Sequence, residues 1–531
     1  MESEVNIVAK NKTSSYVLTL KLNTNIHEEN TINKKLEIAR NISNALTGKV
    51  LKRYKLMLES KEYKRIKKEL NPVNKNYHNS DDKKSKKSFD KQRKELYKQL
   101  EKVYLRFGLS QYSLYEDVKP MYKHFKDNIG SLEAQAIADR IWSKFDKLLH
   151  GNANKITFSK YGEYNSIENK WNKSGMKYDV NTNVIKWQGL KIPVVIKSND
   201  IYAQKAIQDR VKYCRIVRKL IRGTYKYYVQ LILEGVPPQK INNETGEIKR
   251  SIGVGNVGID IGTRTIAISS QYDVKLLELC PEVESIEYQK LILQRKLDRQ
   301  RRSNNPNNYN KDGTIKRGVK LKWNKSNKYI KTQNELRELQ RKQASIRKQS
   351  HEKLANYIIS LGDRILVETM NFKGLQKRAK NTTINKKGRF NKKKRFGKSL
   401  ANKAPSMLIE IINRKLKYNG LDILKINTYK VKASQYSHFT DDYNKKELKD
   451  RWNNDIEIQR DMYSAFLIMN VNEDLETINR ELCFKEFDNF KELHDREIIR
   501  LRESKKNGIK LISSMGIWYK IRFWIEPLYY H

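Results

Sequence analysis

The sequence predicts a multidomain α+β protein whose C-terminal half contains a mixed sheet flanked by helices. Two observations carry this prediction. Residues 257–280 hold three short apolar runs in quick succession, typical of a strand meander, and helical and strand-like segments alternate after them. Residues 154–236 instead form short runs rich in Val, Ile, Tyr and Trp between Asn and Gly turns, which indicates a separate β-domain.

In the N-terminal half, residues 15–22 alternate like a strand, and apolar residues then recur with a helical period from Ile32 to Met57. Lys-rich text with helical spacing continues to about residue 147, and its polar stretch 71–88 predicts a loop. Residues 237–251 are typical of a linker. In the C-terminal half, the predicted elements are strands 257–262, 265–272, 275–280, 363–370 and 421–429, a basic helical region 288–361 interrupted at 303–318, and helices 406–418 and 458–470.

The charge balance indicates a polyanionic partner. The chain of 531 residues has 109 Lys and Arg against 60 Asp and Glu, a formal net charge of +49. A membrane surface is disfavoured because there is no apolar run of membrane-spanning length and no signal-peptide core. Three scattered cysteines fit neither a disulfide scaffold nor a zinc site. A nucleic acid in a reducing cytoplasm is the expected setting.

The stretch Gly253–Gly258 matches the G-x-G-x-x-G pattern of a dinucleotide-binding loop. That site needs a strand before the glycines and a helix after them. Here a linker precedes and strands follow, so we expect the glycines to admit the chain into a crowded central strand instead.

Three acids stand where a buried charge is costly. Asp260 and Glu368 interrupt two predicted buried strands, and Asp461 lies on the apolar stripe of helix 458–470. A structural explanation pairs each acid with a nearby arginine, for which Arg264, Arg364 and Arg460 are available. The alternative is a shared site for two Mg²⁺ ions, with Mn²⁺ as a substitute, because all three side chains offer hard oxygen ligands. We favour the metal site because the three acids fall on one predicted sheet and its helix.

These segments resemble a known family. "VGIDIGTRTIAISS", "ILVETMNFKGL" and "QRDMYSAFLIMN" are similar, in that order, to the three motifs of the RuvC nuclease domain of transposon-encoded TnpB proteins and compact type V CRISPR effectors. The helix "RKQASIRKQSHEKLANYII" also resembles the family's bridging segment. The resemblance implies an RNase H-like (RuvC) domain, a guide RNA, a DNA target, and Asp260, Glu368 and Asp461 as catalytic metal ligands.

The resemblance also implies a domain layout, in which an N-terminal β-barrel wedge domain is interrupted by a helical recognition lobe. The expected parts are the wedge domain (1–30 and 151–250), the recognition lobe (31–150), the RuvC domain (251–426 with the basic helical segment 287–361, and 456–470), a target-nucleic-acid-binding insert (427–455) and a C-terminal extension (471–531). A bacterial, nucleoid-associated cytoplasmic protein is expected, with a homodimer on one guide RNA as a further expectation.

Two features depart from the family pattern. The family's zinc ribbon falls at the insert, but this insert has no cysteine and only His438, so we expect no zinc there. The third motif has Tyr463, Ser464 and Leu467 where the family has Asn and Ala. The extension after Asn470 has no counterpart in the family.

A basic stretch follows Glu368. Residues 373–398 contain twelve Lys or Arg and no acid. A charge run alone predicts a solvated loop, but the position beside the acids favours phosphate binding. The candidate nucleic-acid contacts are Lys377, Arg378, Lys380, Arg389, Lys392, Lys393, Lys394 and Arg395.

The sequence thus predicts an RNA-guided, metal-dependent endonuclease that cuts double-stranded DNA at a single RuvC site after recognising a short flanking motif. The alternative is an RNA-guided DNA-binding repressor derived from such a nuclease. A D-D-E transposase is disfavoured because its Glu comes last, whereas here Glu368 is the central acid.

Overall fold

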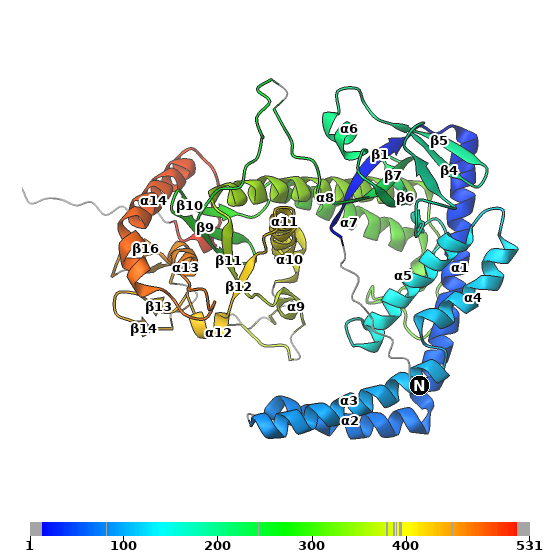
Figure 1. Cartoon of the computed structure of the whole chain (residues 1–531), viewed down its shortest axis with the longest axis horizontal. Helices are drawn as coiled ribbons and strands as arrows, with labels where there is room; N and C mark the ends of the chain where they lie inside the picture. Colours follow the sequence, from blue (N-terminus) through cyan, green and yellow to red (C-terminus); the bar gives the residue numbers. More distant parts are fainter. Residues whose placement is uncertain are drawn as a thin grey trace, which may run out of the picture. The chain divides into compact units, whose positions relative to one another are not determined.

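The computed structural model describes residues 13–517, apart from 81, 243, 379–380, 386–387, 389, 392–395, 446, 448–449 and 454. The chain divides into two compact units, Met1–Pro238 and Gln239–His531, so the boundary falls within the predicted linker. Figure 1 shows the elements along the chain. No helix in the described ranges is both long enough and apolar enough to cross a membrane.

The first unit is built on a seven-stranded sheet of order β2-β6-β7-β1-β5-β4-β3. The predicted first strand forms as β1, and its alternate residues are buried. It pairs antiparallel with β7, from Ser15 opposite Glu234 to Lys21 opposite Tyr228. The first strand of the chain therefore lies among strands from residues 166–234. The strands are β1 (Ser15–Leu22), β2 (Ser166–Glu168), β3 (Lys177–Asp179), β4 (Val184–Trp187), β5 (Leu190–Val195), β6 (Val211–Ile221) and β7 (Thr224–Glu234).

Five helices separate β1 from β2 in sequence. The first, α1, is tied to the sheet by two cations. Buried Lys35 lies 4.9 Å from the ring centre of Trp187 in β4, and Arg218 of β6 donates to Asn33 at 2.7 Å. The helices of this unit are α1 (Ile26–Glu59), α2 (Lys61–Asn79), α3 (Lys83–Arg106), α4 (Gln111–His124), α5 (Ser131–Leu149) and α6 (Ile201–Ala206).

The prediction of a loop at 71–88 was wrong. Apart from a short connection, α2 and α3 continue through this stretch. Asp82 caps α3 by accepting from the backbone N–H of Ser85 at 2.9 Å, and the Arg93 guanidinium lies 4.0 Å from the ring centre of Tyr77 across the hairpin. Capping and stacking thus hold a helical hairpin in a segment whose composition is that of a loop.

The second unit contains a five-stranded sheet of order β10-β9-β8-β11-β12. The predicted meander forms as three antiparallel strands, and β11 then joins β8 in parallel, followed by β12. The strands are β8 (Asn256–Ile261), β9 (Thr265–Ser270), β10 (Val274–Glu278), β11 (Arg364–Glu368) and β12 (Leu424–Ile426).

Helices cover both faces of this sheet. One face packs on α13 and α14, and the other on the C-terminal part of α8 and on α11. Its remaining elements are α7 (Val283–Asn304), η1 (Pro306–Asn308), α8 (Asn327–Leu361), α9 (Phe372–Leu375), α10 (Gly397–Lys403), α11 (Pro405–Lys417), α12 (Thr428–Val431), the hairpins β13 (Tyr436–Ser437) with β14 (Asp442–Tyr443) and β15 (Trp452–Asn453) with β16 (Ile458–Gln459), α13 (Arg460–Met469), α14 (Arg480–Lys506) and η2 (Ser513–Met515).

The glycine motif serves close packing, as the sequence predicts. A Cβ at Gly258 would lie 2.0 Å from the carbonyl oxygen of Ala465 and 2.4 Å from the amide nitrogen of Met469. Gly253 similarly meets the Ser360 carbonyl oxygen at 2.3 Å. Strands follow these glycines, so no helix N-terminus faces a phosphate site. Gly258 instead lets the backbone of α13 rest directly on β8.

We expect Gly258→Ala to lower the free energy of unfolding by about 1–3 kcal/mol, because the methyl group must push α13 away from the sheet. Thermal unfolding of the full chain measures the loss. The matched control is Gly48→Ala in α1, where a Cβ meets nothing closer than 3.9 Å and helix propensity improves. Equal stability of the two variants would contradict the close contact.

Candidate active site

Asp260 and Glu368 lie beside each other on neighbouring parallel strands. The register pairs Val367 of β11 with Ile259 of β8, so the next residue on each strand is an acid. Adjacent strands lie about 5 Å apart. Ile259 and Val367 point into the core formed with α8 and α11, so the alternation of side chains turns both acids toward α13.

Asp461 approaches the same point from α13. The helix crosses β8 at Gly258, which contacts Ala465. Asp461 is one turn before Ala465, about 6 Å along the helix, and Asp260 is two residues beyond Gly258, about 7 Å along the strand. Both acids are therefore within about 7 Å of this crossing, one measured along the helix and the other along the strand. Gln459 fixes the start of α13 by accepting from the N–H of Met462 at 2.8 Å.

The electrostatics agree with this convergence. The pKa of Asp260 is raised well above its ordinary value, first by burial and then by the charges of Glu368 and Asp461. Arg460 and Arg451 oppose the shift without cancelling it. Burial also raises the pKa of Glu368. Three carboxylates thus share one partly buried site that is short of positive charge.

The arginine explanation holds for one acid of three. Arg264 pairs with Glu278 and Glu284, and Arg364 pairs with Glu473. Among the described residues no cation lies within ion-pair distance of Asp260 or Glu368. Asp461 does pair, with Arg460 at 3.3 Å and with Arg451 at 3.7 Å. The sequence identified Arg460 as a partner and missed Arg451, which no periodic pattern marks.

The donor chemistry suits a hard divalent cation, since three carboxylates offer only oxygen. As placed here, however, no three His, Cys, Asp or Glu side chains in the described part of the chain are arranged to hold a metal ion. The Asp461 carboxylate is directed to the two guanidinium groups instead. The two arginines thus occupy the Asp461 carboxylate in this structure.

The insert and the C-terminal extension meet at Arg451. A Cβ at Gly516 would lie 2.4 Å from the Cβ of Arg451. The neighbouring Trp452 donates its indole N–H to the Gly516 carbonyl oxygen at 2.8 Å. The amide nitrogen of Arg460 donates to the carbonyl oxygen of Arg451 at 2.9 Å. The extension therefore fixes the backbone that carries an arginine to Asp461.

A second contact holds the other hairpin of the insert. Arg480, at the start of α14, donates to the carbonyl oxygens of His438 and Phe439 at 2.7 and 2.9 Å. The buried His438 ring lies among Phe439, Phe484, Phe487 and Tyr463, whose hydroxyl is 2.6 Å from Nδ1. Burial lowers the pKa of His438 to about 4, so the ring is neutral at pH 7. Aromatic packing and one arginine hold this hairpin against α14.

We expect Arg480→Ala to destabilise the insert by about 1–3 kcal/mol, because two charge-assisted hydrogen bonds are lost. Hydrogen exchange at residues 436–443 should speed up accordingly. Arg496→Ala, which removes an exposed i,i+4 pair with Glu492 on the same helix, is the control and should change little. Unchanged exchange in Arg480→Ala would contradict this role of α14.

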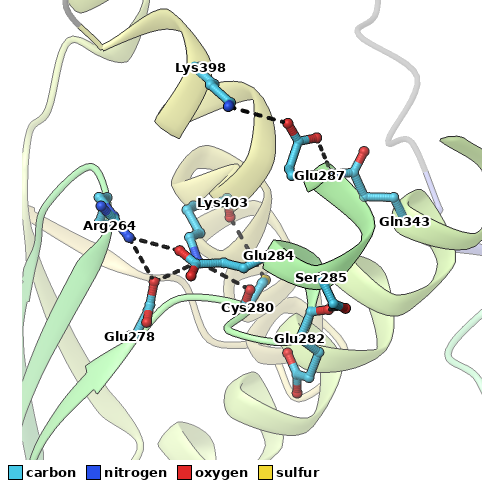
Figure 2. A network of polar contacts seen from close by, with 10 residues as sticks. All are labelled: Arg264, Glu278, Cys280, Glu282, Glu284, Ser285, Glu287, Gln343, Lys398 and Lys403. Carbon is cyan, nitrogen blue, oxygen red and sulfur yellow. Dashed lines mark hydrogen bonds and ion pairs between the residues drawn. The ribbon is translucent and has the colours of Figure 1, made fainter. Parts of the chain in front are cut away.

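The basic stretch after Glu368 returns to a buried anchor. Lys403, at the end of α10, is 3% exposed and donates to Glu278 at 2.7 Å and to the Cys280 carbonyl oxygen at 3.3 Å. Figure 2 shows Lys403 and Arg264 converging on Glu278 and Glu284, with Lys398 paired to Glu287 nearby. The stretch is therefore tethered at β11 and at α10.

Of the candidate contacts on this stretch, the structure describes Lys377 and Arg378. Both are exposed. The other six, Lys380, Arg389, Lys392, Lys393, Lys394 and Arg395, lie outside the described residues.

No protein-family model matches the chain, and no curated protein matches it. Among solved structures, the chain is similar to a Cas12f1–sgRNA–target DNA complex, with 13% identity over 86% of this chain and 99% of that chain and a TM-score of 0.38. It is also similar to a CRISPR-Cas12f ternary complex, with 12% identity over 84% of this chain and 82% of that chain and a TM-score of 0.23. Likenesses this weak carry no argument about function.

Proposed function

We propose that the protein is an RNA-guided, metal-dependent DNA endonuclease. One observation carries the proposal: Asp260, Glu368 and Asp461 converge from two strands and a helix at a site short of positive charge. The sheet supports an RNase H-like domain, because three antiparallel strands are followed by two parallel ones with helices on both faces. The net charge of +49 supports nucleic acid as the partner.

The three acids would hold two Mg²⁺ ions, which on binding supply an activated water and stabilise the leaving oxygen. Two arginines of the chain already contact one of these acids. Arg451 and Arg460 pair with Asp461 in the metal-free protein, and if Asp461 held an ion these two guanidinium groups would be free beside the site. A guanidinium group can then hold a phosphate of the DNA strand by paired hydrogen bonds. The segment around Gly516 keeps Arg451 at that place.

One observation favours a second candidate, an RNA-guided DNA-binding repressor. The Asp461 carboxylate is already paired with arginines, and no ready metal site is formed by the described residues. A protein that keeps this arrangement when bound to nucleic acid would bind its target without cutting it. The uncompensated pair Asp260 and Glu368 ranks this candidate second, because a binding protein gains nothing from it.

Two linked measurements test the proposal. RNA that co-purifies with the protein is sequenced, and the complex is then given a plasmid carrying the matching target, with Mg²⁺ or with EDTA. The proposal predicts a uniform scaffold with a variable spacer, and target cleavage only with Mg²⁺. Guide-dependent binding without cleavage would establish the repressor, and random cellular RNA with an intact plasmid would overturn both.

A further inference from the structure

Two long helices of the second unit are joined by an ordered connection. Helices α7 and α8 run alongside each other (Figure 1), and the segment between them has no helix or strand other than the short η1. We call residues 305–331, which include the first turn of α8, the basic knob. The 22 residues of α7 place it about 33 Å from the start of that helix. That start lies beside Arg264, four residues beyond Asp260.

The basic knob is folded by its own side chains. Buried Asn305 donates to the Asn324 carbonyl oxygen at 2.9 Å and accepts from its N–H at 2.6 Å. Asn308 donates to the Lys322 carbonyl oxygen at 2.7 Å. The rings of Tyr309 and Trp323 meet edge to face at 5.9 Å. These contacts give a defined surface in a stretch that the sequence predicts only as an interruption.

The charge of the basic knob is almost entirely positive. The basic knob carries eight Lys or Arg between Lys311 and Lys331, all exposed, against a single acid, Asp312. Asp312 caps its own turn by accepting from the Thr314 N–H at 2.9 Å and from its hydroxyl at 2.7 Å. None of the eight forms an ion pair with any residue in the described ranges.

The helices that support the basic knob pair several of their cations with acids. On α7, Arg301 and Arg302 share Asp298, at 2.8 and 3.0 Å. On α8, Arg341 pairs with Glu338 at 2.7 Å. Other cations of these helices, among them Arg295, Lys296 and Lys342, form no ion pair with the described residues, but acids stand between the cations along each helix. The basic knob differs in its balance, since eight cations stand against one acid there, and their mutual repulsion is relieved by a bound polyanion.

We propose that the basic knob binds the sugar–phosphate backbone of a nucleic-acid duplex at a place distinct from the cleavage site. The inference rests on the proposed function for its partner class. Helix α7 is about 33 Å long, roughly one helical turn of duplex, and it separates the basic knob from the strand segment that follows Asp260. The contact reads no bases, because Arg302 and Arg301 cover the rings of Tyr309 and Trp323. Duplex RNA and duplex DNA both present this backbone.

The test removes three charges from the basic knob of the full-length protein, as Lys320→Gln, Lys322→Gln and Lys325→Gln together. The control removes three charges from α14, as Lys485→Gln, Lys491→Gln and Arg496→Gln. Binding is measured with RNA and DNA duplexes of about thirty base pairs, roughly three turns, across a salt series. Each lost phosphate contact should lower the slope of log affinity against log salt by about 1.

We expect the basic-knob variant to lose at least about tenfold in affinity and about 2–3 in salt slope, while the control stays near the wild type. A loss with RNA alone assigns the basic knob to RNA, and a loss with DNA alone assigns it to DNA. A slope equal to that of the control with both probes overturns the inference. DNA cleavage is measured separately. If the wild type does not cleave DNA but the basic-knob variant still shows the lower salt slope, the proposed nuclease function is refuted and the proposed binding by the basic knob is supported.

Discussion

Replacing any one of the three acids by its amide should abolish DNA cleavage and leave guided DNA binding intact. Asp260→Asn, Glu368→Gln and Asp461→Asn each remove a negative charge and a proposed metal ligand while keeping side-chain size. Metal-assisted hydrolysis depends on several kcal/mol of transition-state stabilisation, so each variant should cut at least about a hundredfold more slowly. Single-turnover cleavage of a target duplex, alongside a filter-binding measurement, separates the two effects.

Glu473→Gln is the matched control, because this acid is exposed in the same unit and pairs with Arg364 rather than with the site. Its cleavage rate should equal that of the wild type. A wild-type rate in any of the three amide variants would remove that residue from the site. Loss of binding together with cleavage would indicate damage to the fold.

Asp260→Asn should also make the metal-free protein more stable at pH 7. The raised pKa of Asp260 means that the folded state holds the proton more tightly than the unfolded state, whose value is 3.8. The favourable contribution is therefore complete below pH 3.8 and is lost as the pH rises through the raised pKa. At pH 7 Asp260 therefore makes the fold less stable than an uncharged side chain of the same size would. For domains of 150–250 residues, each kcal/mol relieved raises the Tm by roughly 2–4 °C.

The measurement is the Tm difference between Asp260→Asn and the wild type in EDTA, followed downward from pH 7. We expect a positive difference that shrinks as the pH approaches 3.8. Glu497→Gln is the contrasting control: this buried acid accepts from Arg500 at 2.6 Å and from the Leu276 N–H at 3.0 Å, so its loss should cost about 1–3 kcal/mol. A lower Tm in Asp260→Asn would mean that this acid, too, is structurally compensated.

The strand and helix assignments around the acids were predictable because each rests on a short local pattern. The apolar runs at β8, β9 and β11 and the apolar stripe of α13 all formed where the sequence indicated. The role of Gly258 was also anticipated, since strands rather than a helix follow the glycines. The predicted domain layout inside these units stays a prediction, as do the metal ligands.

The features that could not be predicted from the sequence depend on contacts between residues that are far apart in the chain. The pairing of Asp461 with Arg451 arises only when the β15–β16 hairpin folds beside α13, and the segment around Gly516 then locks it there. The loop predicted at 71–88 was wrong because the helical hairpin found there is stabilised by the stacking of Arg93 on Tyr77, across two elements. The folding of the basic knob likewise depends on Asn305 reaching Asn324, nineteen residues away.

The most direct test is an experimental structure of the protein determined with Mn²⁺ present. The account predicts metal density contacted by oxygens of Asp260, Glu368 and Asp461, with Asp461 turned away from Arg451 and two ions roughly 3.5–4 Å apart. Carboxylate oxygens separated by more than about 10 Å, too far to share neighbouring ions, would contradict it. So would Mn²⁺ density placed elsewhere while Asp461 stays paired with its arginines.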